Sequence, residues 1–174
     1  YILSDSTFID DFTTTNLAPS FYDLDGDGDL DAIIGEFNGY LLYYTNTDTG
    51  WTYSGHYLGL DLIGKTVPAW GDVDQDDDDD LVLGTKDGMV AIYINDGDIN
   101  TLQLAAQLDI GDDASPAILA DGSIVVGNEA GELILLHYDG TDTLAIQNAL
   151  EYPYCGQNLA PWPIPFSGSE QEDL

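Results

Sequence analysis

Acidic side chains at alternate positions form the clearest chemical pattern in this sequence. The segment from Asp23 to Asp31 reads D-L-D-G-D-G-D-L-D and lies between two short apolar runs. Alternate carboxylates in a tight loop converge on one centre, and Gly28 at the sixth place lets the backbone turn with positive φ. Hard oxygen donors at this density suit Ca²⁺, which takes about 6–8 oxygen ligands. We expect side-chain ligands from Asp23, Asp25, Asp27 and Asp31, and a main-chain carbonyl ligand from Asp29.

A second acidic run has the same phase 49 residues further along the chain, from Asp72 to Asp80. Asp77 stands where the first loop has Gly28, and Asp tolerates left-handed backbone less easily than Gly. The extra acids raise repulsion in this loop, so its order should depend more strongly on a bound metal. The expected ligands are the side chains of Asp72, Asp74, Asp76 and Asp80 and the main-chain carbonyl of Asp78.

Acidic runs are also typical of solvated or disordered surfaces. Here two runs recur at equal phase between apolar segments, which favours metal binding. Mg²⁺ keeps its waters and demands octahedral geometry, so it fits these loops less well than Ca²⁺. The sequence therefore predicts two calcium sites.

The loops belong to an internal repeat, marked by Pro19, Pro68 and Pro116 at spacings of 49 and 48 residues. In each unit an apolar triplet ends in glycine, a turn ends in a second glycine, and another apolar stretch follows. Such runs are typical of β-hairpins, and we find no convincing helical periodicity. A weaker strand is expected after each hairpin, over Tyr53–Leu60, Leu102–Leu108 and Leu144–Leu150.

Each unit is therefore predicted to form four short antiparallel strands that neighbouring units must cover, as in a β-propeller blade. We expect an all-β arc of about three four-stranded blades plus partial flanking strands. The arc is either part of a larger propeller or is completed by another chain, because open sheet edges invite pairing. The expected divisions are an outer strand of a preceding blade (1–15), a first blade (16–64), a second blade (65–113), a third blade with a degenerate loop at Asp121-Gly122-Ser123 (114–157), and the start of a further blade or a tail (158–174).

The first two units resemble FG-GAP or VCBS-type repeats, the blades of integrin-alpha-like β-propellers. The resemblance is carried by the segments 19–35 and 68–84, and it is weaker in the third unit. It implies calcium-loop blades of a secreted or cell-surface protein. Repeats of this type occur in adhesion proteins, lectins, polysaccharide lyases and large surface structures, so the resemblance leaves the function open.

Composition excludes several classes of function. The 174 residues carry 33 acidic side chains, two lysines and no arginine, for a formal net charge of −31. Binding to nucleic acid or to an anionic membrane surface needs the cations that this chain lacks. No apolar run approaches the roughly 20 residues of a transmembrane helix. The 44% of hydrophobic residues is enough to build a core.

No residues suggest catalysis. The two histidines, His56 and His137, lie near no nucleophile motif. The many acids invite comparison with glycosidases, but 12 of the 33 lie in the two predicted metal loops. Aromatic residues such as Trp51 and Trp70 could stack on sugars, although packing between blades is the favoured interpretation.

We therefore expect a non-catalytic, calcium-binding extracellular module for adhesion, protein interaction or structural assembly. Two alternatives remain. The chain could be the scaffold of a secreted carbohydrate-binding or carbohydrate-active protein, or a subunit of a surface filament or layer. Its expected partners are further blades or another protein, with a glycan as a third candidate.

Overall fold

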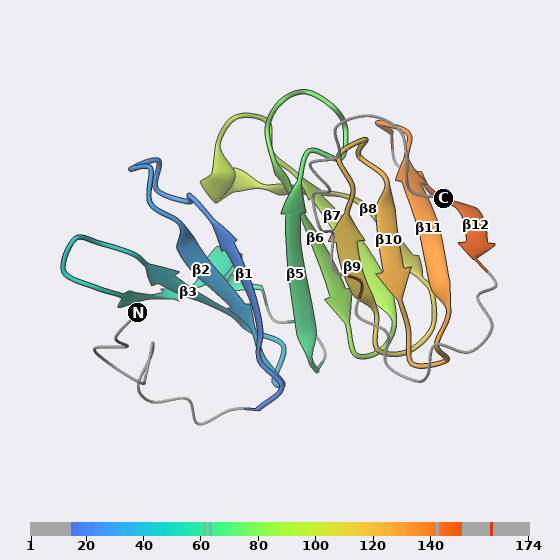
Figure 1. Cartoon of the computed structure of the whole chain (residues 1–174), viewed down its shortest axis with the longest axis horizontal. Helices are drawn as coiled ribbons and strands as arrows, with labels where there is room; N and C mark the ends of the chain where they lie inside the picture. Colours follow the sequence, from blue (N-terminus) through green and yellow to red (C-terminus); the bar gives the residue numbers. More distant parts are fainter. Residues whose placement is uncertain (1–14, 61, 63, 142, 151–160, 162–174) are drawn as a thin grey trace, which may run out of the picture.

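The chain folds into three four-stranded antiparallel sheets, as predicted (Figure 1). The computed structural model describes residues 15–60, 62, 64–141, 143–150 and 161. None of the helical turns in this part of the chain is long and apolar enough to cross a membrane. The first sheet holds β1 (Ala18–Tyr22), β2 (Asp31–Gly35), β3 (Leu41–Thr45) and β4 (Thr52–His56); the second holds β5 (Thr66–Gly71), β6 (Asp80–Thr85), β7 (Met89–Ile94) and β8 (Gln103–Asp109); the third holds β9 (Ser115–Ile118), β10 (Ile124–Gly127), β11 (Leu133–Tyr138) and β12 (Leu144–Leu150).

The three sheets fall within the units expected at 16–64, 65–113 and 114–157. The expected flanking strands at 1–15 and 158–174 lie outside the described residues, apart from Thr15 and Pro161. The strand expected over Tyr53–Leu60 is shorter than predicted. It ends at His56 and gives way to a 3-10 turn, because Leu58 and Gly59 both adopt positive φ, at 54° and 59°.

The outermost strand of each sheet carries the same irregularity. The register with its neighbour slips between Tyr43 and Tyr44 in the first sheet and between Ile92 and Tyr93 in the second. In the third sheet the slip lies between positions 135 and 136. Such bulges bend an edge strand and discourage pairing with other strands. The bulge is therefore part of the repeat.

The central strands of the second sheet, β6 and β7, are buried on both faces. Leu81 and Leu83 of β6 face the first sheet, whereas Val82 faces the third. This alternation follows from the two-residue period of a strand. Because both faces of β6 are covered by neighbouring sheets, the sequence of this strand is an uninterrupted apolar run from Leu81 to Gly84.

Trp70 packs between the first and second sheets, as its place on the inner strand predicts. Its ring stacks on Tyr22 with a centroid separation of 5.0 Å and meets the edge of Tyr57 at 6.0 Å. The indole is therefore part of the packing between these two sheets.

Adjacent sheets are joined by the same backbone hydrogen bond. The amide of Thr66 donates to the carbonyl of Glu36 at 3.3 Å, between the first and second sheets. The amide of Ala114 donates to the carbonyl of Thr85 at 3.0 Å, between the second and third. The sequence repeat is thus also a repeat of the contacts between sheets.

The inner strands β1, β5 and β9 lie side by side (Figure 1) and line one hollow of ≈ 540 Å³. Proline lacks an amide hydrogen, which suits it to edge strands. Each inner strand contributes one proline to this lining, and a fourth proline joins them: Pro19, Pro68, Pro116 and Pro161.

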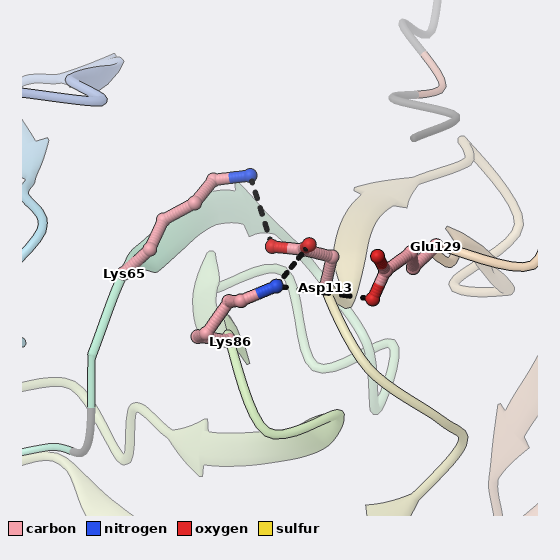
Figure 2. A network of polar contacts seen from close by, with 4 residues as sticks. All are labelled: Lys65, Lys86, Asp113 and Glu129. Carbon is pink, nitrogen blue, oxygen red and sulfur yellow. Dashed lines mark hydrogen bonds and ion pairs between the residues drawn. The ribbon is translucent and has the colours of Figure 1, made fainter. Parts of the chain in front are cut away.

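Both cations of the chain meet at one carboxylate. Figure 2 shows Lys65 and Lys86 reaching toward the carboxylate of Asp113, with Glu129 nearby. The Nζ of Lys86 lies 2.5 Å from Asp113 and 3.9 Å from Glu129, and the Nζ of Lys65 lies 3.8 Å from Asp113. Connections in an antiparallel meander alternate between the two ends of a sheet. This network therefore lies at the end opposite the acidic loops, and it neutralises the lysines locally.

Candidate metal centres

The first acidic loop is folded around the carboxylate of Asp23. The amides of Gly26 and Gly28 donate to its two oxygens at 2.8 and 3.0 Å. Asp23, Asp25 and Asp27 each place a carboxylate oxygen within 4.8 Å of the others. Loss of solvent, opposed by the amide of Asp27, raises the pKa of Asp25, and the neighbouring carboxylates add to this. Three of the four predicted side-chain ligands thus lie together.

The second loop repeats this arrangement around Asp72. The amides of Gln75 and Asp77 donate to its two oxygens at 2.6 and 3.2 Å. Asp72, Asp74 and Asp80 place carboxylate oxygens within 4.8 Å of one another. Desolvation, followed by repulsion from neighbouring carboxylates, raises the pKa of Asp74. The structure again brings together three of the four predicted side-chain ligands.

Asp80 is the last residue of the second acidic loop and the first residue of β6, and it is fully buried. Its carboxylate accepts the amides of Val73 and Asn95, both at 2.9 Å, so it joins the loop to the turn after β7. Burial raises the pKa of Asp80 to about 6, against the opposing effect of the hydrogen bonds that its carboxylate accepts from the backbone. Near neutral pH a carboxylate in such a place favours a nearby cation.

Asp31 has the equivalent place in the first sheet but a different neighbourhood. It is also fully buried, and it accepts the amides of Leu24 at 3.0 Å and Asn46 at 2.8 Å. The hydroxyl of Tyr43 also donates to it at 3.3 Å. Asp31 lies outside the group formed by the other carboxylates of its loop. We attribute the difference to Tyr43, which has no hydroxyl-bearing counterpart because Ile92 takes its place.

The remaining predicted ligands are exposed. Asp76 lies outside the three-carboxylate group of its loop. Asp29 and Asp78, expected to bind through their carbonyls, use their amides to donate to Asp27 and Asp76 at 2.9 and 3.0 Å. These bonds hold the tips of the two loops in the same conformation.

One oxygen in the second group has no hydrogen-bond partner. Asp74 Oδ1 is buried, and no donor in the described part of the chain reaches it. Buried polar atoms are nearly always paired, and an exception calls for an explanation such as an ion. The donor set around this atom consists of carboxylate oxygens, which fits a hard cation.

Three supporting residues escaped the sequence prediction. Asn46 and Asn95 supply the amides that hold the buried aspartates, and their spacing of 49 residues was a signal that could have identified them. Gln75 stands where the first loop has Gly26, yet it adopts the same left-handed backbone, with φ of 66° against 76°. No local signal marks Gln75, because glutamine has no preference for that conformation.

The third sheet has a short turn in place of a loop. The carboxylate of Asp121 accepts the amide of Ser123 at 3.1 Å, which lowers the pKa of Asp121. This turn contributes to none of the carboxylate groups found in the described residues. Asp121, the one acidic residue that this turn retains from the repeat, thus has its carboxylate bound within the turn itself.

Asp77→Gly is expected to stabilise the metal-free protein by about 1 kcal/mol, because glycine adopts positive φ without steric cost. Asp77 has φ of 76° and lies in a crowded acidic loop. Urea unfolding in EDTA measures the change. Asp96→Gly removes the same charge from an exposed turn where φ is not positive, so it serves as the control. Equal effects of the two substitutions would show that charge, rather than backbone strain, is responsible.

Comparisons with protein-family models, curated proteins and solved structures found no match to this chain. The chain itself presents two acidic loops that share most of their hydrogen bonds, each with three carboxylates gathered at one point. Such an arrangement can bind a divalent cation through oxygen atoms.

Proposed function

We propose that this chain is a calcium-stabilised arc of a β-propeller that serves as an extracellular binding or structural module, without catalysis. The observation that carries the proposal is the buried, unpartnered Oδ1 of Asp74 beside Asp72 and Asp80. A cation would satisfy this atom and offset the repulsion among the three carboxylates. The equivalent loop around Asp23 would hold a second ion.

Calcium suits these loops better than other divalent ions. It accepts irregular sets of oxygen ligands and does not demand the octahedral geometry of Mg²⁺. The three gathered carboxylates would bind it directly, and carbonyls such as that of Asp78 and water would complete the coordination. Asp-rich sites of modest affinity match the millimolar calcium found outside cells. This match supports an extracellular location.

The propeller arrangement is supported by the way the sheets meet. The three inner strands surround one hollow, and Pro161 of the partial fourth unit lines it too. Both contacts between sheets use equivalent backbone hydrogen bonds, so a further sheet could be added in the same way. Further blades or a protein partner would cover the outer faces of the first and third sheets.

A calcium titration followed by calorimetry tests the proposal and should give two ions per chain. Terbium luminescence offers a second readout, with terbium in place of calcium. Tyr22 directly precedes the first acidic loop and stacks on Trp70, so these rings can transfer excitation to a terbium ion bound nearby. Asp25→Asn and Asp74→Asn should each remove one ion, whereas Asp48→Asn, in an exposed turn, should remove none. Absence of binding to the wild-type chain would refute the proposal.

A further inference from the structure

The second acidic loop touches the third sheet. The side-chain Nε2 of Gln75 donates to the carbonyl of Asp121 at 3.1 Å, across the boundary between the two sheets. Gly122 packs against the same loop, since a Cβ added there would lie 3.0 Å from the carbonyl oxygen of Val73. The loop and the short turn over residues 119–123 are therefore in direct contact.

The first loop has no such contact at the equivalent places. A Cβ added at Gly26 or Gly28 would meet nothing within 4 Å of it in the described structure. Gly26 is the counterpart of Gln75 in the repeat. The second loop thus has a side chain that reaches its neighbour at the position where the first loop has none.

Gln75, which makes the hydrogen bond to Asp121, has a strained backbone conformation. Its φ of 66° lies in the left-handed region, which residues with a Cβ adopt at a cost. Strain of this kind persists where the surroundings enforce it. The amides of Gln75 and Asp76 both donate to Asp72, so the carboxylate that would bind the ion also fixes the conformation of Gln75.

We propose that Gln75 is a positioning residue that couples ion binding in the second loop to the order of the turn over residues 119–123. This inference rests on the proposed calcium binding. An ion held by Asp72 and Asp74 would fix the loop, and Gln75 would transmit this order to the carbonyl of Asp121. Because coupling between two sites is reciprocal, the contact with the turn also strengthens ion binding in that loop.

Hydrogen exchange of the full chain, followed by NMR with and without Ca²⁺, tests the coupling. The reporters are the turn amides of Leu119, Gly122 and Ser123, each of which has a defined acceptor. Calcium should slow their exchange in the wild-type chain. Gln75→Ala should abolish this slowing and weaken calcium binding at the second site about fivefold, the effect of one lost hydrogen bond. Binding at the first site should not change.

Two further variants separate coupling from general stability. Gln107→Ala changes an exposed glutamine of β8 in the same sheet and should leave the coupling intact. Gln75→Gly relieves the backbone strain but still lacks the amide, so it too should lose the coupling. If two ions bind but calcium leaves the turn amides unchanged, or Gln75→Ala keeps the slowing, the inference is overturned and the proposed function stands. If no ion binds, both fail.

Discussion

Removal of calcium by EDTA is expected to lower the melting temperature of this protein by about 10–20 °C. An ion at 100 times its dissociation constant stabilises the folded state by about 2.7 kcal/mol, so two sites contribute about 5 kcal/mol. For a chain of this length, each kcal/mol changes the melting temperature by about 2–4 °C. Thermal unfolding followed by circular dichroism, in excess Ca²⁺ and in EDTA, measures the difference.

Burial explains why the second site should account for much of this change. The pKa of Asp80 is raised to about 6, whereas a carboxyl of the unfolded chain titrates near its ordinary value of 3.8. Without an ion, the folded state therefore binds more protons, and its stability falls as the pH rises through this window. A bound cation favours the ionised carboxylate and removes that penalty. The calcium effect should accordingly be larger at pH 7.5 than at pH 5.

Two comparisons make the result specific. Mg²⁺ at the same concentration should restore little of the lost stability, since it fits the loops poorly. The double variant Asp25→Asn/Asp74→Asn should melt at the same temperature with and without Ca²⁺, whereas the exposed-turn control Asp48→Asn/Asp96→Asn should respond like the wild type. Equal melting temperatures of the wild-type chain in calcium and EDTA would contradict calcium stabilisation.

The repeat made the fold readable from the sequence. Three units with prolines, paired glycines and apolar runs in the same order predicted three four-stranded sheets, and those sheets are observed. The phase of the two acidic loops likewise predicted which carboxylates gather, apart from Asp31 and Asp76. Local patterns sufficed here because strand period and turn chemistry act within a few residues.

The contacts between units could not be predicted in this way. The hydrogen bond from Gln75 to Asp121 joins residues 46 positions apart, and the network at Asp113 joins Lys65 and Lys86 of the second unit and reaches Glu129 of the third. Neither contact can be recognised from local periodicity, because each contact depends on how one sheet is placed against the next.

Gly84 shows this most clearly. The sequence marks it only as the glycine that ends an apolar triplet, like Gly35 in the first unit. In the structure, an added Cβ would lie well under 3.0 Å from the carbonyl oxygen of Ala114, the residue before β9, and a Cβ on Gly35 would meet Thr66 in the same way. These neighbours are backbone atoms, so they cannot move aside as a flexible side chain would. The glycines are therefore required for the sheets to approach each other.

Gly84→Ala is expected to destabilise the protein by about 3 kcal/mol, because one methyl group must push the second and third sheets apart. Urea unfolding in saturating Ca²⁺ measures the loss, with ion binding held constant. Gly140→Ala is the matched control: Gly140 has φ of 76° but open space around it, so alanine there should cost only about 1 kcal/mol of backbone strain. Calcium binding at the first site should survive Gly84→Ala, since that loop does not touch the disturbed boundary. A loss for Gly84→Ala no larger than the loss for Gly140→Ala would mean that the sheets can move apart at little cost, so that their close approach does not require glycine at this position.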